Sequence, residues 1–159
     1  MNQHVISVRV ENRSGVLARV AGLFSARGYN IDSLAVSETE QDDVSVMTIV
    51  VRGDDRIIEQ VKKQLNKLID VIKVIDHHPF TSVQRELILV KVSAPPAKRP
   101  EIYNLVEIFG GKIVDISKKT ITVEATGEPE TLNNFIELLR PYAIKELNRT
   151  GRISLLKEQ

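Results

Sequence analysis

The chain has 159 residues, 42% of them hydrophobic, and its 22 Lys and Arg residues nearly balance its 21 Asp and Glu residues. This composition suits one medium or two small globular domains, and it lacks the basic excess of a nucleic-acid-binding protein. Cysteine is absent, which excludes disulfides, thiolate metal sites and cysteine nucleophiles. No apolar run approaches the roughly 20 residues of a membrane helix, and the N-terminus alternates like a strand rather than a signal peptide, so we expect a cytoplasmic protein without membrane contact.

The first elements are a strand and an amphipathic helix. Residues 4–10 alternate apolar and polar side chains, which predicts a strand with one buried face. A helix should follow from Gly15, with Gly28 at its end in a conformation of positive φ. Arg19 is expected on its solvent side. The apolar positions that recur at helical spacing are Val16, Leu17, Val20, Leu23 and Phe24.

Two further strands are predicted at residues 31–37 and 44–52, joined by a polar turn. The second of these, VSVMTIVVR, is apolar on both faces. Helices in a small α+β domain usually cover one side of the sheet, so the other face of this strand needs a partner surface. We therefore expect a homodimer joined through this domain.

A second helix, capped by Asp54 and Asp55, and a fourth strand at residues 71–76 complete the first half. The apolar face of this helix is expected to comprise Ile57, Ile58, Val61, Leu65, Leu68 and Ile69. The order strand, helix, strand, strand, helix, strand is that of a ferredoxin-like domain.

The same order repeats in the second half. Strands are predicted at residues 86–92, 112–117, 120–126 and 144–148, with one helix around Ile102 to Phe109 and another opening at Pro129. The fold class is thus α+β, with two consecutive ferredoxin-like βαββαβ domains at residues 1–78 and 85–159 and a linker at residues 79–84.

The loop before the first helix carries the most suggestive polar groups. Gly15 lies at a helix N-terminus, whose unpaired N–H groups and positive dipole end can receive a carboxylate. Asn12 can turn its neutral amide oxygen toward an ammonium group. Ordinary capping and turn formation explain the same residues equally simply, so this pattern alone leaves both readings open.

Other chemistry has little support in the sequence. No G-x-G-x-x-G, phosphate-binding loop or G-x-S-x-G motif occurs, and the adjacent His77 and His78 would point to opposite sides of an extended chain, where they cannot share a metal ion. Base stacking by an RNA-recognition domain would need aromatic residues on the central strands, and only 4% of the residues are aromatic.

The stretch ENRSGVLARVAGLFSARGYNI, residues 11–31, resembles the opening of the small regulatory subunit of acetohydroxyacid synthase (acetolactate synthase). RELILVKV from Arg85 and FGGKIVDIS from Phe109 resemble the second half of that family. The resemblance implies an N-terminal ACT domain, which senses amino acids, followed by an ACT-like domain.

It also implies a regulatory chain without catalytic residues or bound cofactors. Its partner would be a catalytic large subunit that carries thiamine diphosphate, magnesium and FAD and gains both activity and feedback inhibition by valine or another branched-chain amino acid. On this resemblance Asn12, Gly15, Val16 and Leu17 form the effector site of one protomer, and Asn30 and Ile31 come from a second.

Three other functions remain open at this point. The chain could be a stand-alone ACT-type sensor acting on another enzyme, a pair of RNA-binding domains, or a small enzyme. Co-purification with a thiamine-dependent large subunit, a salt-dependent gel shift with RNA, and turnover by the purified chain separate these possibilities.

Overall fold

The computed structural model describes residues 2–158, which form two compact units. The first comprises the chain up to Val83 together with the C-terminal residues from Arg152 onward, and the second spans Gln84–Gly151. The division differs from the expected linker at residues 79–84, because one continuous strand begins at Ser82 and runs on into the second unit. It also differs at the C-terminus, which was expected to belong to the second domain and instead packs with the first.

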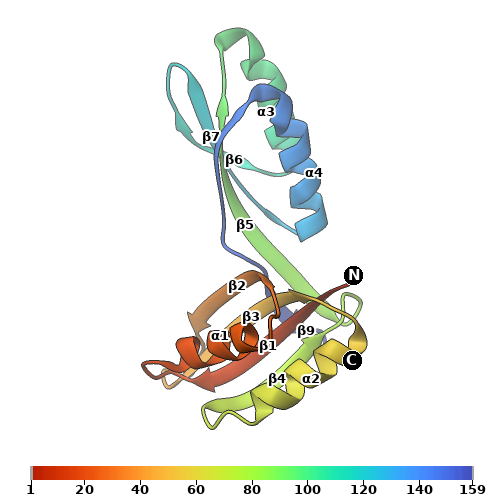
Figure 1. Ribbon diagram of the computed structural model, residues 1–159. Helices are drawn as coiled ribbons and strands as arrows, with labels where there is room; N and C mark the ends of the chain where they lie inside the picture. Colours follow the sequence, from red (N-terminus) through yellow and green to blue (C-terminus); the bar gives the residue numbers. More distant parts are fainter. Residues whose placement is uncertain (1, 159) are drawn as a thin grey trace. The chain divides into compact units, whose positions relative to one another are not determined.

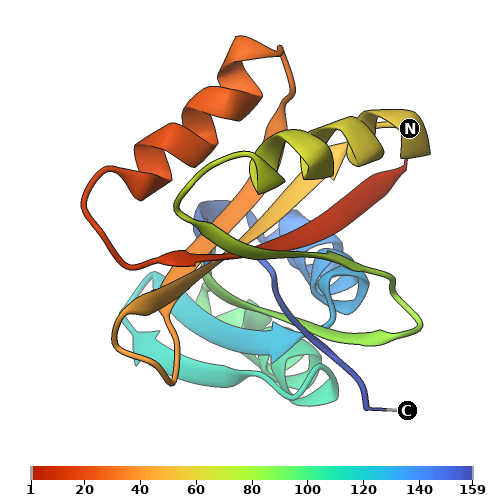
Figure 2. The ribbon, with the colours of Figure 1, turned by 90° about the horizontal axis from the view of Figure 1, so that it is seen from below.

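The first unit has the predicted βαββαβ order and forms a four-stranded antiparallel sheet in the order β2-β3-β1-β4. Both helices lie on the same face of this sheet (Figures 1 and 2). The elements are β1 (Gln3–Glu11), α1 (Val16–Ala26), β2 (Ile31–Glu38), β3 (Val44–Arg52), α2 (Asp55–Asn66) and β4 (Val71–His77).

Glycines flank helix α1 on both sides, as predicted. Gly15 and Gly28 have φ values of 86° and 70°, which residues with a Cβ rarely adopt. Between them the inner face of the helix packs on the sheet through Val16, Val20, Leu23 and Phe24.

Helix α2 confirms its predicted cap and most of its predicted face. The side chain of Asp54 accepts a hydrogen bond from the Ile57 N–H at 2.9 Å. Ile58, Val61 and Leu65 are buried, but Ile69 is 94% exposed, so its assignment to the core was wrong. The helix ends at Asn66, and the turn that follows no longer holds helical spacing.

The helix-free face of the first sheet is covered in part by the chain itself. Ser33, Val50, Val5 and His77 are paired in register and form one row across the four strands. The C-terminal segment reaches both ends of this row: the N–H of Arg152 donates to Ser33 Oγ at 3.4 Å, and Ser154 Oγ lies 2.8 Å from His77 Nδ1. This segment contains β9 (Ile153–Leu156), a strand that the sequence did not predict. It provides part of the cover that we assigned to a partner, while a homodimer remains a prediction.

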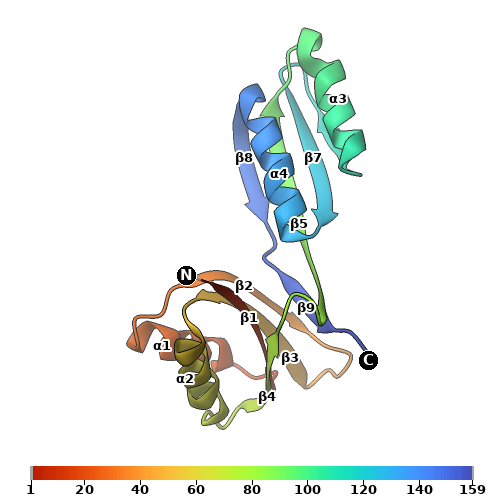
Figure 3. The same ribbon diagram turned by 90° about the vertical axis from the view of Figure 1, so that its right-hand side faces the viewer.

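The second unit repeats the architecture. Its sheet has the order β6-β7-β5-β8, with α3 and α4 on one face (Figure 3). A core of buried aliphatic side chains and Phe135 lies between these layers, and the partly buried ring of Phe109 stacks on Phe135. The elements are β5 (Ser82–Ser93), η1 (Pro96–Lys98), α3 (Arg99–Ile108), β6 (Lys112–Ile116), β7 (Thr120–Gly127), α4 (Pro129–Leu139), η2 (Arg140–Tyr142) and β8 (Ile144–Arg149). Within residues 2–158, none of the helices has the length and apolar character needed to span a membrane.

Candidate functional site

Helix α1 starts with backbone donors that have no side-chain cap, and the first of them, the Val16 N–H, has only a long hydrogen bond of 3.5 Å to the Arg13 carbonyl. Gly15 is its N-cap residue, and among the described residues no side chain forms a capping hydrogen bond there. The first N–H groups of a helix have no partners within the helix, and they carry the positive end of its dipole. This helix N-terminus therefore offers a place for an anionic group such as a carboxylate.

Arg19 lies beside this N-terminus and is exposed, as expected. Its ion pair was not predicted: Nε donates to Asp70 Oδ2 at 2.7 Å. The Asp70 side chain is buried, while that of Arg19 is half exposed. A guanidinium group is thus held one helical turn from Gly15, with its charge partly balanced by the carboxylate of Asp70. Sequence reasoning missed the pair because the two residues are 51 positions apart.

Asn12 is fixed in the loop before the helix by the hairpin that joins β2 and β3. Its backbone N–H donates to the carbonyl of Asp43 at 2.8 Å, and its Nδ2 donates to the carbonyl of Asp42 at 3.1 Å. Because Nδ2 has a carbonyl partner, the amide oxygen faces away from the hairpin and can accept a hydrogen bond.

The two aliphatic residues that α1 is predicted to contribute to the site have different positions. Val16 is 2% exposed and belongs to the core beneath α1, so it anchors the start of the helix. Leu17 is 45% exposed and remains available to a ligand on the surface. The helical spacing of apolar residues does not tell which of these two neighbours is buried, because both lie near the boundary of the helix's apolar face.

Along the strands, Asn30 and Ile31 lie at the opposite end of the sheet from Asn12. Asn30 is exposed at the start of β2, and Ile31 packs partly against the core. Glu11, next to Asn12, pairs with Val44 of β3, whereas Ile31 pairs with Val51, seven residues further along the same strand. At about 3.4 Å per residue this separates the two groups by about 24 Å within one chain.

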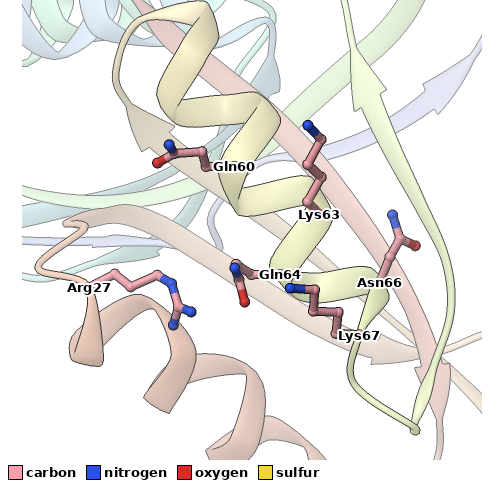
Figure 4. Close-up of a pocket in the computed structure, with 6 residues that line it drawn as sticks. All are labelled: Arg27, Gln60, Lys63, Gln64, Asn66 and Lys67. Atoms are coloured by element: carbon pink, nitrogen blue, oxygen red, sulfur yellow. The ribbon is translucent and has the colours of Figure 1, made fainter.

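A separate basic depression of about 520 Å³ lies between the C-terminal ends of α1 and α2 (Figure 4). Arg27 extends from the end of α1 toward α2, and the rest of its lining lies along α2. The lining residues are Arg27, Gln60, Lys63, Gln64, Asn66 and Lys67. Arg27 and Lys67 are the C-cap residues of their helices, where cations offset the negative dipole ends. Without an aliphatic wall, this depression does not suit a branched-chain amino acid.

The family models match both units. Residues 6–73 match a model described as an AHAS small subunit-like ACT domain, and residues 85–158 match one described as the small subunit of acetolactate synthase. A probable acetolactate synthase small subunit of Archaeoglobus fulgidus is 55% identical over 155 residues, which cover 98% of this chain and 97% of the relative. The chain belongs to the acetolactate synthase small-subunit family.

Further relatives of this small subunit agree in sequence and in fold. The acetolactate synthase small subunit of Aquifex aeolicus is 48% identical over 159 residues, covering 99% of this chain and 83% of the relative. The crystal structure of the small subunit from Thermotoga maritima superposes with a TM-score of 0.92 at 40% identity, covering 100% of this chain and 99% of that one. These comparisons confirm the predicted family and fold, and the ACT domain indicates a regulatory role.

Proposed function

We propose that this small subunit is the regulatory partner of a catalytic acetolactate synthase large subunit, whose activity it raises and makes sensitive to valine or another branched-chain amino acid. On this proposal the small subunit contributes no catalytic residue of its own. Thiamine diphosphate, magnesium and FAD belong to the large subunit.

The main support for this proposal is that hydrogen-bond donors and a hydrogen-bond acceptor for a ligand lie close together at the start of α1. The N–H groups at the start of α1, which no side chain caps, suit a carboxylate, and the guanidinium of Arg19 lies beside Gly15. The oriented amide oxygen of Asn12, three residues earlier, suits an ammonium group. Both groups of an amino-acid zwitterion thus find chemically matched partners, and Leu17 offers apolar contact to an aliphatic side chain.

The separation of about 24 Å between the Asn12 and Asn30 ends of the sheet supports a dimeric site. Residues so far apart in one chain cannot close on a molecule the size of valine. A second copy that places its Asn30 and Ile31 against the first copy's Gly15 loop brings both halves together. Such a contact is self-complementary and generates two equivalent sites per homodimer.

Calorimetry of the purified full chain with valine, leucine and isoleucine tests the binding step. We expect saturable binding of at least one of them, with one site per protomer. The reconstituted complex with the large subunit should be more active than the large subunit alone and should be inhibited by the same amino acid. Activation without binding of any of the three would contradict the effector assignment, and no activation at all would contradict the partnership.

A further inference from the structure

Asp32 occupies an irregular position on the edge strand β2. The pairing of β2 with β3 shifts register between Ile31 and Ser33, which leaves Asp32 as the extra residue of a β-bulge. Bulges redirect side chains and are common beside binding sites. The Asp32 side chain turns onto its own sheet, where it is only 15% exposed.

Three side chains donate to this carboxylate. Arg52 Nε and Gln3 Nε2 donate to Oδ2 at 2.6 and 3.1 Å, and Asn30 Nδ2 donates to Oδ1 at 3.2 Å. Burial by itself would raise the pKa of Asp32, but the hydrogen bonds from Arg52 and Gln3 outweigh it, and the pKa lies below its ordinary value. The carboxylate therefore stays ionised near neutral pH and acts as an acceptor only.

This fixes the orientation of the Asn30 amide. An ionised carboxylate cannot donate, so the Asn30 group that faces it must be the NH₂ group and not the oxygen. The Asn30 oxygen consequently points to the other side, where it offers an acceptor. Asn12 is oriented in the same sense, because its NH₂ group is held by the carbonyl of Asp42.

We propose that Asp32 is a positioning residue of the effector site, which holds the Asn30 amide so that its oxygen accepts a hydrogen bond from the α-ammonium group of the bound amino acid. This assignment rests on the proposed function and deepens it. It gives the polar groups of the site separate tasks: the N-terminus of α1 at Gly15 receives the carboxylate, and the amide oxygens of Asn12 and, from the second protomer, Asn30 receive the ammonium group. The site thereby selects amino acids over the corresponding 2-oxo acids, which carry the same side chain and carboxylate but no ammonium group.

Two substitutions of Asp32 test the assignment in the full-length chain. In Asp32→Asn the new amide can present either its oxygen or its NH₂ group, so the orientation of Asn30 is no longer imposed. In Asp32→Glu a carboxylate remains within reach on a side chain that is one methylene longer. Glu59→Gln serves as a matched control, because it removes a carboxylate paired with Lys62 at 2.6 Å on α2, outside the proposed site.

Calorimetry should compare three probes: valine, valinamide, which retains the ammonium group, and 3-methyl-2-oxobutanoate, which lacks it. For Asp32→Asn we expect affinity for valine and valinamide to fall by the same factor, about tenfold for one misdirected hydrogen bond, with no change for the 2-oxo acid. Asp32→Glu should restore most of the selectivity for valine over the 2-oxo acid, and Glu59→Gln should leave it unchanged.

The results that would contradict the assignment of Asp32 can be told apart. Equal losses for valine and the 2-oxo acid, or no rescue by Asp32→Glu, would show that Asp32 only maintains the fold of β2 and would overturn the assignment. Unchanged valine affinity in Asp32→Asn would overturn it as well. If the wild-type chain binds no branched-chain amino acid, the proposed function itself fails, and the assignment falls with it.

Discussion

The guanidinium of Arg19 lies directly over Gly15, with its Nη1 3.1 Å from the position that a Cβ atom on Gly15 would take. The backbone of Gly15 also has a positive φ of 86°, which L-residues other than glycine rarely adopt. The positive φ therefore favours glycine at the start of α1, and a Cβ atom there would also press on the end of the Arg19 side chain. The Arg19 guanidinium borders the space that the missing side chain leaves.

Gly15→Asp should abolish valine sensitivity while preserving activation of the large subunit. The new carboxylate would occupy the place of the ligand's own carboxylate beside Arg19, and the strained backbone should cost about 1–2 kcal/mol of folding stability. Valine inhibition and basal activation of the reconstituted complex measure the two effects separately.

Gly22→Asp is the matched control for this substitution. It places the same charge on the same helix, at an exposed glycine where a Cβ atom would meet nothing within 4 Å and where φ is not positive. Valine sensitivity should survive there. If both variants lose it, or if a folded Gly15→Asp variant fails to activate, the Gly15 site and the activating surface are not separable as proposed.

A mixed dimer tests whether Asn12 and Asn30 meet across protomers. One chain carries Asn12→Ala and the other Asn30→Ala. If each pocket combines Asn12 of one chain with Asn30 of its partner, both losses fall in one pocket and the other stays intact. Calorimetry should then find one near-normal site per dimer and one weakened by about 1–3 kcal/mol or more. Two equally weakened sites would place both residues in the pocket of a single chain.

His77 should make the stability of the first unit sensitive to mild acid. The ring is buried, with Nε2 2.8 Å from Ser7 Oγ and Nδ1 2.8 Å from Ser154 Oγ. Burial lowers the pKa of His77, and the opposing charge of Asp76 offsets this only in part. The unfolded chain therefore binds a proton at a higher pH than the folded one, and stability is lost as pH falls below the unfolded pKa of about 6.5.

Urea unfolding at pH 7.5 and 5.5 measures this effect. His77→Gln, which retains a polar side chain without titrating, should reduce the loss of unfolding free energy between the two pH values. The exposed neighbour His78 provides the control, and His78→Gln should retain the wild-type loss. An equal pH dependence in the wild type and in His77→Gln would show that other groups cause it.

Substitutions in and after α2 should separate the buried from the exposed part of the apolar pattern. Leu65 is fully buried, and Leu65→Ala should destabilise the first unit by about 2–5 kcal/mol through lost contacts and a residual cavity. Ile69→Lys should change stability by no more than about 0.5 kcal/mol, because this side chain is already in solvent. Chemical denaturation compares the two, and a large effect of Ile69→Lys without a change in oligomeric state would contradict the exposed position.

Much of the fold was predictable because its signals are local. The alternation in β1, the apolar run of β3, the glycines that flank α1 and the proline that opens α4 are each read from neighbouring residues. The position of Gly15 at a helix N-terminus follows from the same signals. Ile69 was misassigned because spacing predicts which residues share a helical face only where the helix continues.

The contacts and side-chain orientations that only the tertiary structure determines join residues that are distant in the chain. The Arg19–Asp70 pair beside Gly15 joins a helix to the turn before β4, and the contact of Ser154 with His77 joins the C-terminal segment to the first unit. The orientation of Asn30 depends on a bulge that exists only because β2 pairs with β3. A sequence specifies the spacing of its hydrophobic residues and the chemistry of its turns locally. Strand register and packing decide which polar atoms face one another, and these arise only when the whole domain folds.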